Sequence, residues 1–275
     1  MRPFFFITFE TMCIQPFQIR KFQKNLKTSQ IGQALWYFRS IGSTSTHLKN
    51  KDSQHLPEGL ICIADQQDEG RGQHNRTWIS EPCTNLMFTV VLKPSDTGRL
   101  QILPLLAGYS VLRAVEEMTG LSLMMKWPND IVRAPHKIGG ILAESVFTGS
   151  RLDRLLIGIG LNVNQMQFDG ADLEHAASIS GLAGGPFDRE ELLSLILSEL
   201  ETNYGLWEKR DIQIIRSINR KIIGYGQWCY IEINGERMSD LHKILGIDPR
   251  GFLLTLDADD TVKTFTHEQV RIFCD

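Results

Sequence analysis

The chain has 275 residues, of which 42% are hydrophobic and 22% charged, close to the average of soluble globular proteins. Its 29 basic and 32 acidic residues give a formal net charge of -3, which argues against a dedicated nucleic-acid binder, because such proteins carry a basic excess. None of the five cysteines has CxxC spacing, so neither a zinc site nor a disulfide scaffold is indicated and a reducing, cytoplasmic setting is favoured.

The first 33 residues have the least regular pattern. The apolar run over residues 4–9 is too short to cross a membrane, and no cleavage site of a signal peptide follows it. We expect residues 1–33 to form a poorly ordered arm. An alternative interpretation is that translation starts at Met12.

From residue 35 onward the apolar pattern predicts alternating strands and helices. Helices are expected over residues 103–118, closed by Gly120, and over 192–207, and the hydroxyls of residues 43–46 suit a helix N-cap. A hairpin turn is expected at residues 149–153. Strands are expected over residues 35–38, 60–64, 86–92, 123–126, 141–147 and 155–160.

Beyond Arg220 the pattern changes to short strand segments separated by glycines. These segments cover residues 228–233, 241–247, 252–256, 262–265 and 270–273. Short, evenly spaced strands are typical of a small all-β barrel. We therefore predict two domains, over residues 34–218 and 219–275, after the arm at 1–33.

The richest chemistry is in the loop over residues 70–78, with the sequence GRGQHNRTW. Glycine lets backbone approach a ligand closely, arginine offers a fork of donors for carboxylate or phosphate, and Trp78 offers a flat face for a ring. A solvated turn or an RNA-binding segment are alternative readings of this loop taken by itself.

Four other segments carry residues suited to binding. The hydroxyls of residues 43–45 can cap a helix or bind a carbonyl, and the amide of Gln67 can donate and accept together. Residues 126–130 (KWPND) and 137–140 (KIGG) combine two lysines and an aspartate around a turn, which surface charges could also explain. Residues 158–162 (GIGLN) form a glycine-rich strand end.

These segments, in this order, resemble the biotin protein ligases, and the resemblance covers residue 35 to the C-terminus. The KWPND segment and the ordered set are its specific part, and residues 247–253 are similar to a strand and turn of the family's barrel. The resemblance implies an α/β (α+β) fold, with a mixed central sheet flanked by helices and followed by a small SH3-like β-barrel.

The resemblance also implies ATP-dependent biotinylation of a lysine on biotin carboxyl carrier protein through biotinyl-5'-AMP. Magnesium would accompany ATP, with its ligands undefined, and no permanently bound cofactor is expected. The residues implied for catalysis are Lys137, Arg71 and Lys126. Those implied for biotin are Ser43, Thr44, Ser45, Gln67, Arg71, Gly72, Gln73, Lys137, Gly140, Gly158 and Leu161. Those implied for the nucleotide are Trp78, Lys126, Asn129, Asp130 and Asn162.

The sequence departs from the family pattern in two places. Gln73 stands where many members have arginine, and Asn75 where they have glycine, so we expect the adenylate to leak faster than arginine would allow. The residues before the catalytic pattern lack two clear helices with a glycine turn, which together with the charge predicts a monofunctional ligase that binds no DNA. No membrane association is expected, and a weak homodimer is possible through the central sheet.

Two other classes of protein stay open at this point. A lipoate-protein ligase or octanoyltransferase would resemble the same catalytic fold, but the GRG loop and KWPND favour biotin. A catalytically inactive module that binds biotin or the carrier would not require Arg71, Lys126 and Lys137, since storage of a ligand needs no cations that face phosphate.

Overall fold

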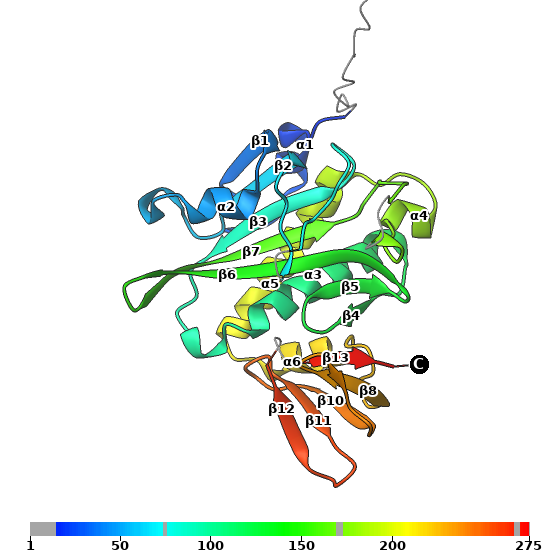
Figure 1. The fold of residues 1–275 in the computed structure, drawn as a ribbon. Helices are drawn as coiled ribbons and strands as arrows, with labels where there is room; N and C mark the ends of the chain where they lie inside the picture. Colours follow the sequence, from blue (N-terminus) through cyan, green and yellow to red (C-terminus); the bar gives the residue numbers. More distant parts are fainter. Residues whose placement is uncertain (1–14, 74–75, 169–172, 267–269, 275) are drawn as a thin grey trace, which may run out of the picture.

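The computed structural model of the protein describes residues 15–73, 76–168, 173–266 and 270–274. A larger α/β part is followed along the chain by a smaller β part (Figure 1). The apolar run at residues 4–9 and Met12 lie outside the described residues. Within them, no helix is long and apolar enough to cross a membrane.

The larger part is built on a mixed sheet. In the described chain its seven strands follow the order β1-β2-β3-β7-β6-β5-β4, and β1 pairs with β2 in parallel while the other neighbours are antiparallel. The continuous apolar run at residues 86–92 forms β3, which is buried along its whole length in the middle of the sheet. The strand bounds are β1 Leu35–Ile41, β2 Ile61–Gln67, β3 Leu86–Leu92, β4 Met124–Lys126, β5 Asp130–Arg133, β6 His136–Thr148 and β7 Arg151–Leu161.

Two long helices cover one face of this sheet (Figure 1). The first is α3 (Ile102–Thr119), and as predicted it ends at Gly120, which has a left-handed φ of 72°. The second is α5 (Arg189–Glu208), which begins where Asp188 accepts from the backbone N–H of Glu191. The shorter helices are α2 (Thr44–Lys49), α4 (Ile179–Ala183) and α6 (Ile212–Asn219), with 3-10 turns at Ser53–His55 and Thr97–Arg99.

The expectation of a poorly ordered N-terminal arm is wrong for residues 15–33. They include helix α1 (Ile19–Asn25), whose Phe22 is fully buried in the main core. The backbone N–H of Phe17 donates to Asp65 at 3.0 Å, and that of Gln18 donates to Glu190 at 2.8 Å. The buried rings of Phe17 and Phe22 and these backbone contacts with distant carboxylates hold the segment, and neither leaves a helical pattern in the sequence.

The C-terminal part is a curled antiparallel sheet, as the short-strand pattern predicted. Its described strands follow the order β12-β11-β10-β8-β13, with β9 paired to β8. Met125 of β4 exchanges backbone hydrogen bonds with Lys221 and Ile223 at 2.7 and 3.0 Å, which joins this part to the larger sheet. The bounds are β8 Trp228–Ile233, β9 Glu236–Arg237, β10 His242–Ile247, β11 Leu253–Leu256, β12 Val262–Phe265 and β13 Val270–Phe273.

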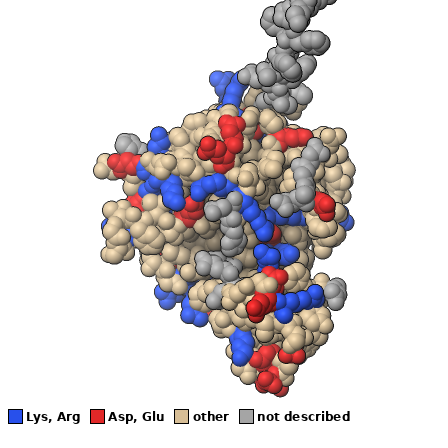
Figure 2. Space-filling view, viewed as in Figure 1, with Lys and Arg blue, Asp and Glu red and all other residues tan. Residues whose placement is uncertain are grey.

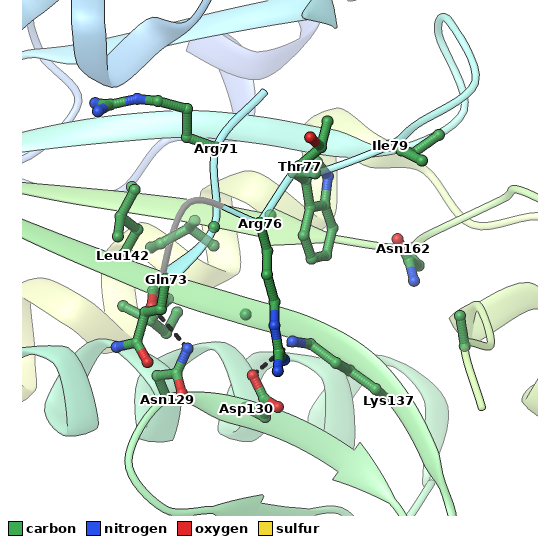
Figure 3. A pocket seen from close by; sticks show the side chains of 18 of the residues that line it. Arg71, Gln73, Arg76, Thr77, Ile79, Asn129, Asp130, Lys137, Leu142 and Asn162 are labelled. Carbon is green, nitrogen blue, oxygen red and sulfur yellow. Dashed lines mark hydrogen bonds and ion pairs between the residues drawn. The ribbon is translucent and has the colours of Figure 1, made fainter. Parts of the chain in front are cut away.

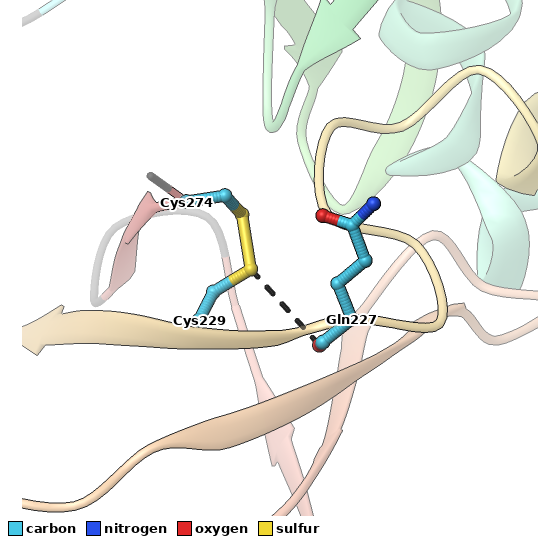
Figure 4. Close-up of a disulfide and its surroundings, with 3 residues drawn as sticks. All are labelled: Gln227, Cys229 and Cys274. Atoms are coloured by element: carbon cyan, nitrogen blue, oxygen red, sulfur yellow. Dashed lines mark hydrogen bonds between the residues drawn. A yellow bond between two sulfur atoms is a disulfide. The ribbon is translucent and has the colours of Figure 1, made fainter.

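Cys229 and Cys274 form a disulfide, which the spacing of the cysteines did not indicate (Figure 4). Antiparallel pairing of β8 with β13 sets Tyr230 opposite Phe273, so the next residues outward are the two cysteines, with Cα atoms 4.7 Å apart. They are 45 residues apart in sequence, and only the strand pairing brings them together. The cytoplasmic setting inferred from the cysteines stays a prediction.

Candidate functional site

One cavity of about 910 Å³ lies between the loop at residues 70–78 and the strands of the central sheet. It brings together almost all residues singled out from the sequence. Leu161 is the exception, because its side chain is fully buried in the hydrophobic core. The predicted residues that line the cavity are Ser43, Thr44, Ser45, Gln67, Arg71, Gly72, Gln73, Trp78, Lys126, Asn129, Asp130, Lys137, Gly140, Gly158 and Asn162.

Hydroxyl and amide groups form one end of the cavity, at the start of α2. Ser43 caps this helix by accepting from the Thr46 N–H at 3.4 Å, so the residue is both a cap and a lining group. Gln67, at the end of β2, accepts from the backbone N–H and the hydroxyl of Thr44 at 2.8 and 3.0 Å. The end of β2 and the start of α2 are therefore fixed against each other.

The two described sides of the loop, residues 70–73 and 76–78, lie antiparallel to each other. Arg71 and Thr77 form an antiparallel bridge, the Gly72 N–H donates to Arg76 O at 2.7 Å, and the Trp78 N–H donates to Gly70 O at 2.9 Å. A side chain at Gly160 would place its Cβ 2.6 Å from the Trp78 indole. Glycine at this position therefore allows the tryptophan to lie flat on the sheet.

Arg71 is engaged at the edge of the cavity. Its guanidinium donates to Glu144 of β6 at 2.6 Å, and the same carboxylate accepts from Lys49 at 3.1 Å. Figure 3 shows the Arg71 side chain pointing away from Lys137. Arg71 and Lys137, two of the three predicted catalytic cations, therefore occupy different parts of the cavity.

Lys137 lies at the opposite end from the hydroxyl groups. Its Nζ is 2.6 Å from Asp130 Oδ1, across the β5–β6 hairpin. Its backbone is held by the following loop, because the Lys137 N–H donates to His175 O at 2.7 Å and its carbonyl accepts from the Ala177 N–H at 2.9 Å. The position of Lys137 is therefore fixed on both the strand and the loop side.

Arg76 was part of the loop motif but was not among the predicted binding residues. It lines the cavity and reaches toward Asp130 and Lys137 (Figure 3). Its signal in the sequence was its place between the loop glycines and Trp78. The other lining residues that were missed carry no polar pattern of their own, and they include Thr77, Ile79, Phe88, Val132, Phe168, Leu173 and His175.

Two turns around Lys137 are fixed by asparagines. Asn129 shares two hydrogen bonds with Ile141, through its side-chain amide at 3.3 Å and its carbonyl at 2.9 Å. Asn162 donates from Nδ2 to Ala177 O at 3.1 Å. Both asparagines therefore hold the walls of the cavity in place as well as lining it.

Among the described residues, two buried polar atoms of the lining have neither a hydrogen-bond partner nor an ion-pair partner. They are the indole N–H of Trp78 and Oδ1 of Asn162. Buried polar groups are normally hydrogen-bonded, so an unmet donor and an unmet acceptor in one cavity suit a polar ligand.

The cavity carries a positive charge overall. The described lining residues include four cations, Arg71, Arg76, Lys126 and Lys137, but the carboxylate of Asp130 alone. Figure 2 shows Lys and Arg side chains gathered across the middle of the same face. Lys126 also lies over the Phe273 ring at 5.9 Å, where the two parts of the chain meet. Cations in a partly enclosed site stabilise an anionic ligand.

The cavity holds few donors for a metal ion. Over the described ranges, no group of three or more His, Cys, Asp or Glu side chains is arranged to hold one. Magnesium commonly binds through one or two carboxylates together with the phosphates of a nucleotide, and Asp130 offers one such carboxylate. The donor set therefore suits a magnesium ion that is held mainly by its nucleotide.

Comparison with known proteins points in the same direction. Residues 37–162 match the biotin/lipoate A/B protein ligase family. The chain is 32% identical over 262 residues to the bifunctional ligase/repressor BirA of Bacillus subtilis, covering 90% of this chain and 76% of that protein. It is 29% identical over 201 residues to the biotin–[acetyl-CoA-carboxylase] ligase of Mycobacterium tuberculosis, covering 70% and 73% of the two chains.

A solved structure shares both the fold and a related sequence. The biotin protein ligase of Aquifex aeolicus in complex with biotin and ATP superposes with a TM-score of 0.76 at 28% identity, covering 87% of this chain and 99% of that one. The agreement extends over the α/β part and the curled C-terminal sheet.

Proposed function

The chain belongs to the biotin protein ligase family, and we propose that it joins biotin to a lysine of a biotin carboxyl carrier domain in an ATP-dependent reaction. The observation that carries this proposal is the single cavity with a hydroxyl and amide end, an indole and a cationic end. The hydroxyl and amide end suits the biotin ring, the indole suits adenine, and the cationic end suits the phosphates.

The reaction has two steps. An oxygen of the biotin carboxylate attacks the α-phosphorus of ATP, the new P–O bond forms, and the bond to pyrophosphate breaks. The ε-amine of the carrier lysine then attacks the carbonyl carbon of biotinyl-5'-AMP, an amide forms, the amine loses a proton and AMP leaves. The first step brings two anions together, and the second develops negative charge on the carbonyl oxygen and on the departing AMP, so cations fixed in the cavity would lower both barriers.

We assign the biotin ring to the end formed by Ser43, Thr44, Ser45 and Gln67. This assignment rests on their shared hydrogen-bond network and on their place in the cavity. A ring that carries both N–H and C=O groups needs acceptors and donors side by side, and hydroxyls with an amide supply both.

We assign the carboxylate and the phosphates to the cationic end. Lys137 and Arg76 reach the same region around Asp130, and Lys126 lies near the C-terminal sheet. Trp78, on Gly160, offers its indole to adenine, and Asp130 is a candidate carboxylate for a magnesium ion that arrives with ATP. When bound, magnesium neutralises phosphate charge.

The other expectations about partners stay proposals. The acceptor is the carrier domain of a carboxylase, and the chain binds no operator DNA. A weak homodimer and a cytoplasmic location also stay predictions, as does the division into domains at residues 34–218 and 219–275.

The assay uses purified protein, ATP, magnesium, biotin and a recombinant carrier domain, with biotinylation scored by streptavidin blot. Labelling should require ATP and the carrier lysine. A parallel measurement of ATP–pyrophosphate exchange compares biotin with lipoate, because the matched family includes ligases for both. Exchange with lipoate alone would overturn the choice of substrate, and no labelling at all would overturn the activity.

A further inference from the structure

Thr89 lies beneath the cavity, and we propose that it sets the direction in which the Ser45 hydroxyl at the biotin end donates. This inference rests on the proposed function and deepens it. Thr89 does not line the cavity, so it is a positioning residue that acts through Ser45.

The absence of a side chain at Gly158 allows Thr89 and Ser45 to come into contact. Thr89 is fully buried in β3 and stands opposite Gly158 of β7. A side chain at Gly158 would place its Cβ 2.7 Å from Ser45 Oγ. The missing side chain therefore leaves the space in which the Ser45 hydroxyl reaches Thr89 Oγ1 at 2.9 Å.

The orientation of the Gln67 amide is fixed first. The backbone N–H of Thr44 can only donate, and it lies 2.8 Å from Gln67. The atom that faces it must therefore be the acceptor Oε1, and the amide NH₂ must point the other way. Nε2 is on the side of Gly70, 3.4 Å from where a Cβ of that glycine would lie.

The directions of the three hydroxyls then follow one from another. Gln67 Oε1 can only accept, so the hydroxyl of Thr44, 3.0 Å away, must donate its one hydrogen to it. Thr44 can then only accept from Thr89 at 2.9 Å. Because the Thr89 hydroxyl donates its hydrogen to Thr44, it can only accept from Ser45. The donors run from Ser45 through Thr89 and Thr44 to Gln67.

This series of hydrogen bonds gives the cavity wall a defined pattern of donors and acceptors. Ser45 has directed its hydrogen inward and can offer only lone pairs to a ligand, whereas the amide of Gln67 offers N–H groups. An acceptor next to a donor is complementary to a ring with an N–H group beside a carbonyl, as in a cyclic urea. Thr89 thus determines that Ser45 acts as an acceptor for a ligand N–H.

The test is the variant Thr89→Val, which keeps the branched shape and removes the hydroxyl. Ser45 loses its internal acceptor and Thr44 its donor, so the KM for biotin in ATP–pyrophosphate exchange should rise about fivefold to tenfold, the value of one neutral hydrogen bond. The KM for ATP should stay unchanged. Thr89→Ser, which restores the hydroxyl, should return the KM for biotin to within about twofold of wild type.

A matched control is Thr255→Val in β11. Thr255 is equally buried, and its hydroxyl lies 3.1 Å from His242 Nδ1, outside the cavity. This variant should lose stability without a change in the KM for biotin, which separates a role in positioning from the general cost of a lost buried hydrogen bond.

A double variant of Thr89 and Ser45 tests the inference more directly than the single variants do. In a Ser45→Ala background the hydroxyl that Thr89 orients is gone, so adding Thr89→Val should raise the KM for biotin by less than about twofold. A folded Thr89→Val protein with the wild-type KM, or full additivity with Ser45→Ala, would overturn the inference. Wild-type protein without biotin-dependent exchange would instead overturn the proposed function, so the two failures are distinguishable.

Discussion

Lys137 Nζ and Asp130 Oδ1 are 2.6 Å apart at the cationic end of the cavity. The pair joins neighbouring strands of one hairpin, and the loop at residues 175–177 holds the backbone of Lys137 from the other side. The ammonium group is therefore positioned before any ligand binds, and less ordering is needed when a carboxylate and a phosphate meet there.

Removal of the Lys137 ammonium should stop adenylation. We expect Lys137→Ala to lower the rate of biotin-dependent ATP–pyrophosphate exchange at least about 100-fold, the usual effect of losing a fixed group that stabilises charge in a transition state. Lys263→Ala is the control, because it removes a lysine paired with Asp257 at 3.4 Å in the C-terminal sheet. A Lys137→Ala rate within about twofold of wild type would remove this residue from the proposed mechanism.

The contact between Gly160 and Trp78 should be sensitive to a single methyl group. In Gly160→Ala the new Cβ would meet the indole at 2.6 Å, so the ring must leave the sheet. We expect the KM for ATP to rise about tenfold or more, from the loss of stacking with adenine. Gly205→Ala in α5 adds the same methyl group where none of the described atoms lies within 4 Å, and it should leave the KM for ATP unchanged.

Gln73 lines the cavity and points toward Asn129 (Figure 3). An arginine there would add a cation close to the phosphate of the adenylate. We expect Gln73→Arg to slow the release of free biotinyl-5'-AMP about fivefold, as one added charge contact of about 1 kcal/mol would do. Release is measured by chromatography of the adenylate without carrier domain, and Gln227→Arg in the C-terminal part controls for the added charge. Equal release from wild type and Gln73→Arg would contradict this expectation.

The parts of the fold that the sequence predicted are those with a local signal. The continuous apolar run of β3 and the alternating segment of β13 were placed at their observed residues, because burial of both faces or of one face leaves a pattern in the sequence. Helix α6 has isoleucines at 212, 214, 215 and 218, a helical spacing that was overlooked next to the domain boundary.

The parts of the site that were missed depend on contacts between distant residues. Thr89 stands inside an apolar strand, and nothing near it in sequence indicates that its hydroxyl meets Thr44 and Ser45. The ion pair between Arg71 and Glu144 likewise joins residues 73 positions apart. A motif identifies which side chains suit a ligand, but strand pairing decides which of them meet each other.

The N-terminal segment should lose its anchor in acid. Glu201 of α5 accepts from the backbone N–H groups of Ser29, Gln30 and Ile31 at 2.7 to 2.8 Å. Burial raises the pKa of Glu201, but these hydrogen bonds outweigh it and hold the pKa below the ordinary value of 4.5. The stabilisation is therefore complete above pH 4.5 and is lost as the pH falls through the lower pKa of the folded state.

Glu201→Gln should lower the free energy of unfolding by about 1–2 kcal/mol at neutral pH, since a charged acceptor is replaced by a neutral one. Denaturant unfolding between about pH 6 and about pH 3 should show a shallower loss of stability for this variant than for wild type. Glu208→Gln, at the exposed end of the same helix, is the control. Parallel pH profiles for wild type and Glu201→Gln would show that the carboxylate does not anchor this segment.

The disulfide between Cys229 and Cys274 should stabilise the C-terminal sheet in oxidised protein. It closes a loop with a sequence separation of 45, and in the chain-entropy account such a loop contributes about 4 kcal/mol by restricting the unfolded chain. We expect dithiothreitol to lower the temperature at which this part unfolds, as followed by hydrogen exchange of the backbone amides of β8 and β13. In a Cys229→Ser variant the C-terminal sheet should unfold at this lower temperature both with and without the reductant. Cys62→Ala removes a free, buried thiol in β2 and should keep the full response. An identical unfolding temperature with and without dithiothreitol in wild type would mean that the bond does not contribute to stability.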